Sequence, residues 1–495
     1  MKIMDKVKDK MRNFLEIKEP NGISINIEQL LDFEGETFKN KIWYRGEPNE
    51  LHRFYTSLND RISNKHFWGS APSKGMNIRK IHTGLPSLIV DVLTDVCTDD
   101  YLGVKLDIRQ EEWDEIAEEN NFRQLIKDCV TEPLVKGDGA FKLSYDETVS
   151  NLPIIEFFPA ERVDYEYNRG RLTAFVFKTE KQFNDKKLTL KEHYSKDGIK
   201  YTLENEDGKE CDMSSFPELA GLQPVKNNAQ FIPAVKVMYR KSKKFPGRGQ
   251  SIYSTKYDNF DALDEAFSQW MLAVRKGQIK NYIPKNFLPV NPYTGEVKSA
   301  NDFDNDFIAL EEDTAEGAKN KIESTQGEIQ HEALLSTYVT ALDLCLQGII
   351  SPSTLGIDVK KLDNAEAQRE KEKTTLYSRN RIVDVLQTVI PELVLKTLKF
   401  KDAINNTVAE KEPEITVNFG GYANPSFEAQ VETVGKARSS YIMSVEASID
   451  ELYGDDKDEE WKKQEVQRIK EEQGIVEMDE PAVSDDLNKI GFDVE

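Results

Sequence analysis

The sequence has few of the residues that build metal sites and disulfide frameworks. Among 495 residues there are four cysteines and five histidines. The cysteines share no paired spacing, which argues against a zinc site and a dense disulfide framework and indicates reduced, mostly buried thiols. The histidines are scattered, with no HExxH-like pair. We therefore expect neither a metal nor a cofactor. The cysteines are Cys97, Cys129, Cys211 and Cys345.

Long apolar runs and nucleotide-binding loops are missing as well. No stretch reaches the roughly 18 uninterrupted apolar residues of a membrane span, and residues 1–18 interleave apolar with charged residues, unlike a secretory signal. The glycine turns at 137–140 and 247–249 lack the lysine and following Ser or Thr of a phosphate-binding loop. We expect no membrane contact and no nucleotide hydrolysis, and a protein that works in the cytoplasm where it is made.

A coherent set of catalytic residues is also missing. The acids at 311–313 stand side by side, but no His, Ser or metal ligand accompanies them at a usable spacing, so a solvated turn explains them better. The chain is therefore expected not to be an enzyme. A nuclease or hydrolase on a helical scaffold is the alternative from that class.

The sequence is rich in packing residues and in acids. It contains 38% hydrophobic residues, with 24 Phe and 18 Tyr, enough for two to four globular modules. The formal net charge of −22 argues against a protein that grips nucleic acid over its whole surface, because such binding depends on Lys and Arg replacing counterions. It is compatible with a conduit that surrounds DNA without holding it, since like-charged walls repel phosphates.

Hydrophobic periodicity predicts an α+β protein that is mostly helical. The segment 1–130 has helical patterns, and the segment 137–213 carries short β-rich runs between turns, which predicts an antiparallel meander. A helix is expected from about 251 to 276 and another over 329–350, with β-like runs at 287–290 and 307–310 between them. This pattern predicts a helical hairpin with a β-containing module at its tip, although two unrelated helices would give it too.

The last third reads as helical again. Pro352 ends the preceding helix, and a third helix is expected from about 364 to 390, where Pro391 restarts it. A β-like run follows at 414–419, and residues 476–495 form an acidic stretch typical of a mobile tail. Three further helices are expected at 427–438, 445–452 and 459–472.

Several pieces, taken in order, carry a family resemblance. They are KIWYRG at 41–46, NIRK at 77–80, GQS at 249–251 before YDNFDALD at 257–264, ISPSTLG at 350–356 before NAEA at 364–367, and the segment from 425 to 472. In this order the chain resembles the portal proteins of long-tailed double-stranded DNA bacteriophages. The resemblance covers most of the chain, and its specificity lies in the order, since no single piece is distinctive.

The resemblance implies a portal-type architecture. Its modules would be an N-terminal arm at 1–24, a wing at 25–250, stem helices at 251–277 and 329–350, a clip at 278–328, a tunnel loop, tunnel helix and remaining wing at 351–424, a crown at 425–475, and an acidic tail at 476–495.

The same resemblance implies a function and partners. About twelve copies would form a ring at one capsid vertex of the virion, assembled in the host cytoplasm, through which double-stranded DNA is packaged and ejected without sequence preference. The ring would bind the large terminase subunit and later a head-completion or adaptor protein, and it would contact the major capsid and scaffolding proteins. Another ring-forming or scaffolding phage protein without a DNA channel is the structural alternative.

Three groups of site residues follow from the resemblance and the charge pattern. The tunnel loop would carry Ser351, Pro352, Ser353, Thr354, Leu355, Lys360 and Lys361, with the two lysines near phosphates. The clip would bind partners through Phe287, Asn291 and Tyr293. Between Lys236 and Lys256 there are seven Lys or Arg and no acid, and Lys241, Lys243, Lys244 and Arg248 form a basic patch for DNA or for a neighbouring subunit. Ordinary connections and solvated loops are the alternatives.

Overall fold

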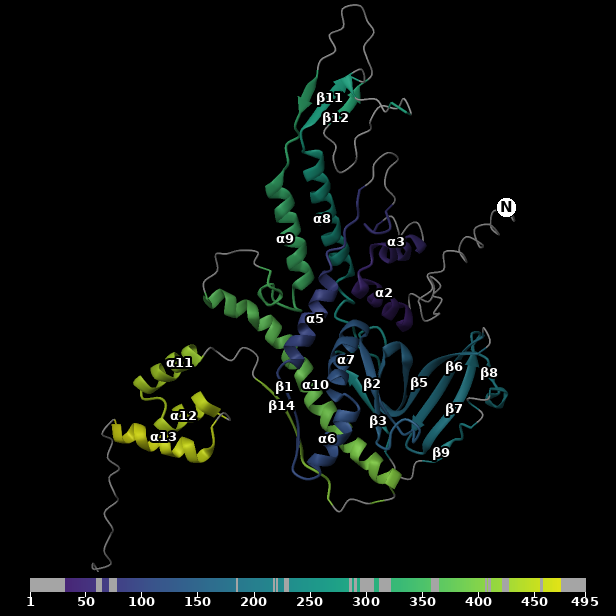
Figure 1. Cartoon of the computed structure of the whole chain (residues 1–495), viewed down its shortest axis with the longest axis vertical. Coiled ribbons are helices and arrows are strands. Elements are labelled where there is room, and N and C mark those ends of the chain that lie inside the picture. Colours follow the sequence, from purple (N-terminus) through teal and green to yellow (C-terminus); the bar gives the residue numbers. More distant parts are fainter. Residues whose placement is uncertain are drawn as a thin grey trace, which may run out of the picture. The chain divides into compact units, whose positions relative to one another are not determined.

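The computed structural model divides the chain into two compact units, Met1–Gly420 and Gly421–Glu495. The residues it describes are 32–58, 65–70, 78–183, 186–216, 219, 221–226, 231–284, 287–288, 292–293, 307–310, 322–357, 365–405, 407, 411–420, 427–454 and 457–472. They form a mixed α and β structure, which confirms the predicted α+β class (Figure 1).

The described part of the chain forms eleven α-helices. They are α2 (Phe33–Arg45), α3 (Pro48–Ser57), α5 (Leu85–Thr98), α6 (Gln110–Glu119), α7 (Phe122–Lys136), α8 (Tyr257–Lys276), α9 (His331–Leu346), α10 (Ala365–Asn405), α11 (Phe427–Ser439), α12 (Val445–Tyr453) and α13 (Glu459–Glu472).

The described strands belong to four small sheets. They are β1 (Tyr101–Leu106), β2 (Asp138–Ser144), β3 (Ile154–Pro159), β4 (Val163–Asn168), β5 (Arg171–Phe183), β6 (Lys186–Ser195), β7 (Gly198–Asn205), β8 (Glu210–Cys211), β9 (Val225–Lys226), β10 (Ala234–Met238), β11 (Lys280–Pro284), β12 (Phe307–Leu310), β13 (Glu323–Thr325) and β14 (Ile415–Phe419).

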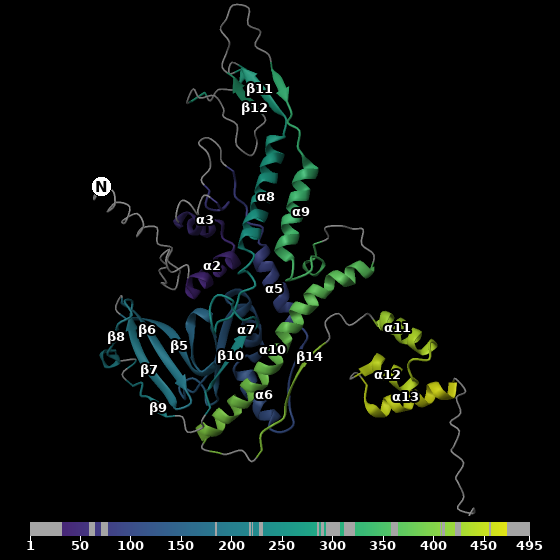
Figure 2. The same cartoon turned by 180° about the vertical axis from the view of Figure 1, so that it is seen from behind.

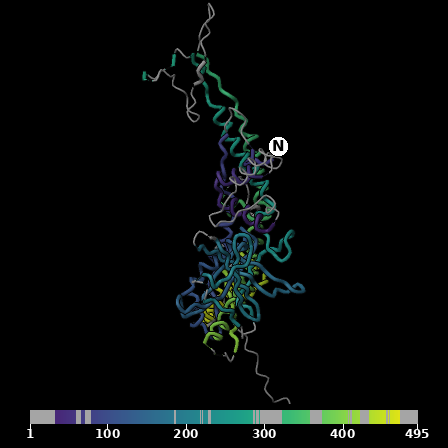
Figure 3. Tube along the Cα trace, turned by 90° about the vertical axis from the view of Figure 1, so that its right-hand side faces the viewer, coloured from purple at the N-terminus to yellow at the C-terminus, as the bar shows by residue number. Residues whose placement is uncertain are grey.

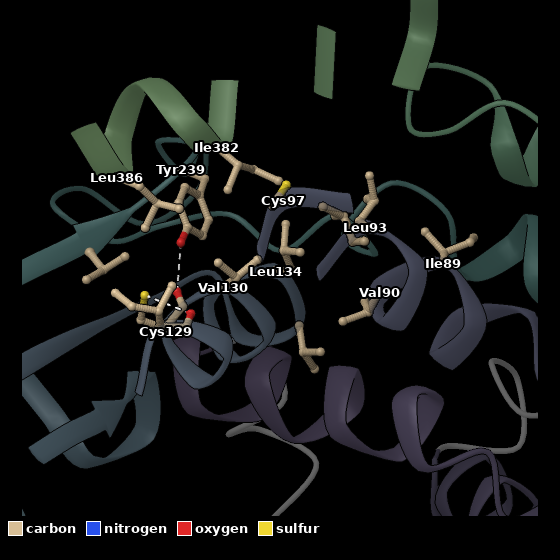
Figure 4. Close-up of a cluster of buried hydrophobic side chains, with 14 of the residues drawn as sticks. Ile89, Val90, Leu93, Cys97, Cys129, Val130, Leu134, Tyr239, Ile382 and Leu386 are labelled. Atoms are coloured by element: carbon tan, nitrogen blue, oxygen red, sulfur yellow. Dashed lines mark hydrogen bonds between the residues drawn. The ribbon is translucent and has the colours of Figure 1, made fainter. Parts of the chain in front are cut away.

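The core of the first unit lies where α5, α7 and α10 pack together. Leu93, Val130 and Leu386 are buried there beside Tyr239, whose hydroxyl donates to the carbonyl of Cys129 at 2.8 Å (Figure 4). Each fully buried aliphatic side chain of this kind contributes roughly 1.5–3 kcal/mol. All four cysteines are free, and three of them are buried, which confirms their prediction as reduced, mostly buried thiols.

The predicted antiparallel meander over 137–213 is confirmed. Strands β4 to β8 form consecutive antiparallel neighbours, and β2 lies between β10 and β3 in a second sheet. The turn predicted at 168–170 joins β4 to β5, and both Arg169 and Gly170 have positive φ values of 50° and 78°. This is the conformation that a two-residue hairpin turn between right-twisted strands requires, and glycine adopts it without steric cost.

Helices α8 and α9 form the predicted hairpin, with a small sheet at its tip. Strand β11 follows α8, pairs parallel to β12 and antiparallel to β13, and α9 then returns along α8. The hairpin extends away from the other sheets of the first unit in three views (Figures 1, 2 and 3). At its upper end a Cβ on Gly277 would overlap the side chain of Ile329, so the close approach of the two arms there suits glycine.

The purely helical reading of the segment 1–130 is wrong at 101–106. These residues form β1, which pairs antiparallel with β14, a strand near the end of the first unit. Periodicity in a short window cannot reveal a strand whose partner is so distant, because the strand depends on pairing rather than on local preference.

Three predicted boundaries also differ. Helix α8 begins at Tyr257 rather than near 251, because Ile252 and Tyr253 are drawn into the core and the backbone N–H of Ile252 donates to Leu134. Residues 287–288 form no strand; the strand of this region is β11, a few residues earlier. Helix α10 continues through Pro391 instead of restarting there.

Burial explains why α10 tolerates its proline. A proline inside a helix costs about 3 kcal/mol or more because it removes a backbone hydrogen bond and crowds the preceding turn. The neighbours Ile390, Leu393 and Val394 are completely buried, and their burial, at roughly 1.5–3 kcal/mol each, exceeds that cost.

The described part of the second unit contains α11, α12 and α13, at the positions predicted for three helices. The hydroxyl of Ser444 caps α12 by accepting from the N–H of Ala447 at 3.1 Å. Tyr453 and Trp461 stack edge to face with ring centres 5.0 Å apart, which joins α12 to α13. Among the described residues, no helix is both long enough and apolar enough to cross a membrane.

Candidate channel and docking surfaces

The base of α8 is fastened by two buried aspartates, Asp261 and Asp264, called here the aspartate anchor. Asp261 accepts from the backbone N–H groups of Phe67 and Trp68 at 2.8 and 3.2 Å. Burial raises its pKa, and these two hydrogen bonds oppose the rise. Because the residues lie three positions apart, both carboxylates face the same side of the helix.

Asp264 makes the larger set of contacts. Its carboxylate accepts from Trp68 Nε1 at 3.0 Å, and from the backbone N–H and hydroxyl of Thr83 at 2.9 Å each. His82 Nδ1 lies 2.7 Å from Asp264 Oδ2, the oxygen that also accepts from Trp68. The residue is 1% exposed. The anchor therefore joins the first helix of the hairpin to two segments that lie far earlier in the sequence.

Lys39 on α2 lies partly buried beside the start of the same helix. Its Nζ lies 3.8 Å from the ring centre of Tyr257 and 5.8 Å from that of Tyr55. Burial lowers the pKa of Lys39 to about 8, although Asp258 and Glu36 act to raise it. The folded chain thus holds this proton less tightly than the unfolded chain does.

This difference predicts a pH effect on stability. Between about pH 8 and 10.5 the unfolded state binds more protons at Lys39 than the folded state, so the cost of burying the charged Lys39 is progressively relieved as the pH rises. Raising the pH from 7 to 10 should improve the stability of the wild type relative to Lys39→Met by about 2–3 kcal/mol, measured by urea denaturation. The exposed Lys105→Met is the control, and equal pH dependence in both variants would contradict the assignment.

The hairpin has an inner aromatic contact and an outer apolar surface. Tyr338 of α9 packs against Phe267 and Trp270 of α8, with ring centres 5.8 and 5.9 Å apart. Four aliphatic side chains on or just beyond the two arms are at least 37% exposed in the isolated chain. This set, called the outer stem residues, is Val274, Ile279, Leu335 and Leu344.

The predicted tunnel-loop residues begin in a connection that is fixed to α10. The N–H of Ser351 donates to Thr375 Oγ1 at 2.9 Å, and Thr354 Oγ1 lies 2.8 Å from the same oxygen. Ser351 is buried, Pro352, Thr354 and Leu355 are half-buried, and Ser353 is exposed. These five residues of the predicted tunnel loop therefore lie against α10, while Lys360 and Lys361 lie outside the described residues.

An open groove adjoins this connection. It has a volume of about 420 Å³ and lies between the end of α9 and α10, where Leu344, Ile350 and Thr374 are among its lining residues. Ser351 and Pro352 line it as well. A contact with another molecule at this groove would reach the base of the predicted tunnel loop directly.

The structure separates the four residues of the predicted basic patch into a half-buried arginine and three exposed lysines. Arg248 is turned into its own chain, where its guanidinium lies 3.1 Å from buried Asp138 and donates to the carbonyls of Ala160 and Val163. Arg248 therefore packs the segment 241–248 against the neighbouring sheets. Lys241, Lys243 and Lys244 are exposed, and Lys244 lies 3.6 Å from Glu36.

The described clip residues are strongly exposed. Phe287 is 61% exposed and Tyr293 is 96% exposed, whereas Asn291 lies outside the described residues. Exposed aromatic side chains are the type that protein interfaces favour, because they bury large areas at little entropic cost.

Comparison with known proteins adds little. No protein-family model matches the chain, and no curated protein matches it. A chain in the virion of a native gene transfer agent particle is 12% identical over 75% of this chain and 91% of that chain, with a TM-score of 0.36. A chain in the neck of such a particle, computed with C12 symmetry, is 10% identical over 74% and 89%, with a TM-score of 0.39. Scores this low leave function to be inferred from the chain's own elements.

The aspartate anchor was not predicted from the sequence. Asp261 and Asp264 stand among apolar residues in the 257–264 segment, and acids on the buried side of an amphipathic helix are a signal of paired burial. Their partners lie in segments too far away to be identified from spacing. In the described part of the chain, no group of three or more His, Cys, Asp or Glu is arranged to hold a metal ion.

Proposed function

We propose that the chain is the subunit of a portal ring, through which double-stranded DNA enters and leaves a capsid at one vertex. The observation that carries this proposal is the helical hairpin α8–α9 with a three-stranded sheet at its tip, followed directly by the fixed connection at 351–357 and the 41-residue helix α10. The sequence resemblance implies a stem, a clip, a tunnel loop and a tunnel helix in this order, and the order of the described elements supports the proposal.

The exposed surface of the hairpin supports assembly into a ring. The outer stem residues stay exposed within the described part of the chain, and four exposed aliphatic side chains on one projecting hairpin are available for contacts between proteins. In a ring each hairpin would pack between two others, so the exposed sides of both arms would be buried against neighbouring copies.

The charge supports a conduit rather than a DNA clamp. With a net charge of −22 for each chain, a ring of many copies would repel phosphates over most of its surface. Such a wall lets DNA slide, because few counterions are displaced by bound lysines or arginines. The chain would form the channel, and a separate terminase motor would drive the DNA through it.

The tip supports docking of partners. Phe287 and Tyr293 lie in the tip region and are mostly exposed. In the proposed ring they would form a circle of aromatic side chains for the terminase large subunit and, afterwards, for the head-completion or adaptor protein. Capsid and scaffolding proteins would surround the body of the ring.

Sedimentation velocity of the purified full chain tests the assembly. One chain has a mass of 56.7 kDa, so a ring of roughly twelve copies would sediment as a species of about 680 kDa. A single boundary near that mass is the expected result. A monomer or dimer at all salt and protein concentrations would contradict the proposal.

A further inference from the structure

The turn between α11 and α12 presents two large apolar side chains to solvent. Tyr441 is 96% exposed and Ile442 is 82% exposed. The two residues follow one another directly, and together they are called here the turn pair. Side chains exposed to this degree gain little from the fold of their own chain, and an exposed tyrosine is the kind of residue that anchors contacts between proteins.

The backbone holds the turn pair in a fixed position. At the end of α11 the N–H of Ile442 donates to the carbonyl of Ala437, and the N–H of Tyr441 donates to that of Arg438, each at 3.0 Å. This is the Schellman arrangement, in which the residue with a left-handed backbone is usually glycine. Here that residue is Tyr441, with a φ of 56°, and Ser444 caps the next helix. The two side chains therefore extend from a turn that is hydrogen-bonded on both sides.

The second unit has a small core of its own. Among its described side chains, only Val434, Ser448 and Ile449 are buried. Three short helices with so few buried apolar groups lack the burial that stabilises an independent domain, and small domains of this kind depend on additional contacts. The exposed turn pair is available for such a contact.

A second apolar surface lies at the other end of α12. Tyr453, the last residue of this helix, stacks on Trp461 of α13 with ring centres 5.0 Å apart, and both side chains are half-buried. These two residues are called here the aromatic pair. The turn pair precedes α12, whose nine residues span about 14 Å. The two apolar surfaces therefore lie at opposite ends of the same helix.

The sequence around the turn pair is basic. Residues 433–444 contain two bases, Lys436 and Arg438, and no acid. The next acid along the chain, Glu446, is bound to Lys470 at 2.8 Å. The turn pair is thus accompanied by positive charge in a chain that is strongly acidic as a whole.

The sequence around the aromatic pair is acidic. Residues 450–460 contain seven acids and one lysine. Asp450 is bound to Lys462 at 2.7 Å. Glu451 and Glu460 are exposed, and in the described part of the chain neither has an ion pair. The two apolar surfaces of the second unit are therefore flanked by charges of opposite sign.

We infer that the turn pair of one copy binds the aromatic pair of a second copy of this chain. The tyrosine and isoleucine would pack on the half-buried rings of Tyr453 and Trp461, while Lys436 and Arg438 would approach the acids of the 450–460 segment. Because the two surfaces lie at opposite ends of α12, the contact is heterologous, and each copy can bind one neighbour at either end. The inference rests on the proposed function only in that copies of the chain assemble.

Photo-crosslinking from position 441 tests the inference. A photoreactive benzoylphenylalanine replaces Tyr441 in the full chain, and assemblies that mix isotope-labelled with unlabelled chains are irradiated. Mass spectrometry should find position 441 of one chain joined to residues 451–461 of the other. The same group in place of Tyr145, which is also exposed, is the control and should not reach that segment. Crosslinks confined to one chain, crosslinks to another surface, or none in an assembled sample would overturn the inference.

The variant Tyr441→Asn supplies a second measurement. Asparagine adopts the left-handed backbone more readily than tyrosine does, so the single chain should stay folded, which thermal melting checks. Assembly should require a protein concentration that is about tenfold higher or more, because an anchoring aromatic side chain is lost. Sedimentation velocity measures this shift, and Tyr145→Asn should assemble as the wild type does.

The outcomes separate this contact from the portal proposal. Rings that lack the expected crosslink overturn the contact alone. Small crosslinked oligomers without rings support the contact and count against the portal, and single chains at every concentration overturn both. If Tyr441→Asn leaves assembly unchanged and instead weakens the binding of a short DNA duplex, the turn pair contacts nucleic acid and the inference is wrong.

Discussion

Replacing Asp264 by alanine should lower the free energy of unfolding by about 3–5 kcal/mol. The carboxylate accepts from Trp68 Nε1 and twice from Thr83, and it lies 2.7 Å from His82 Nδ1. With Asp264 at 1% exposure, water cannot replace it without rearrangement. Alanine would therefore leave several buried donors without acceptors, each at a cost of about 1–3 kcal/mol, partly relieved by local relaxation.

Asp258→Ala is the matched control for this prediction. Asp258 lies on the same helix, but its side chain is 88% exposed, so its loss should change the stability by less than about 0.5 kcal/mol. Guanidinium denaturation of both variants measures the difference. Similar stabilities for Asp264→Ala and Asp258→Ala would show that the aspartate anchor does not hold α8 to the preceding segments.

Replacing Leu335 by glutamate should abolish assembly while leaving the chain folded. Leu335 is an outer stem residue on α9 and is 40% exposed, so a glutamate there is tolerated in the single chain. In the proposed ring the same position faces a neighbouring copy, and every interface would acquire a buried carboxylate without a partner. Burying such a charge costs several kcal/mol per site, which is repeated around the ring.

Ser336→Glu adds the same charge at the next residue, which is polar and exposed. Sedimentation velocity should show rings for Ser336→Glu and monomers for Leu335→Glu, and a cooperative thermal transition of Leu335→Glu should show that its single chain is folded. If Leu335→Glu assembles as well as the control, the hairpin is not the contact between copies, and the outer stem residues need another explanation.

The elements that were predicted correctly are those whose signal is local. The α8–α9 hairpin, the small sheet at its tip and the meander at 137–213 were predicted from apolar spacing and turn residues. One such turn is Arg169-Gly170, with its two positive φ values. The three helices of the second unit were predicted in the same way, and the structure places them within one residue of the expected bounds.

The features that were missed depend on contacts between distant segments. Strand β1 exists because β14 pairs with it, and α8 begins late because Ile252 and Tyr253 are buried beside α7. Pro391 is tolerated because its neighbours are buried. Likewise, the pairing of Arg248 with Asp138 joins residues from distant parts of the sequence, which no spacing rule connects.

Electron microscopy of the purified chain, with class averages viewed along the symmetry axis, tests the portal proposal most directly. The proposal predicts rings of about twelve subunits with a central hole of roughly 20–40 Å, wide enough for a duplex about 20 Å across. Rings with a closed centre would favour a scaffolding protein without a DNA channel, and single chains under every condition of salt and concentration would contradict the proposal altogether.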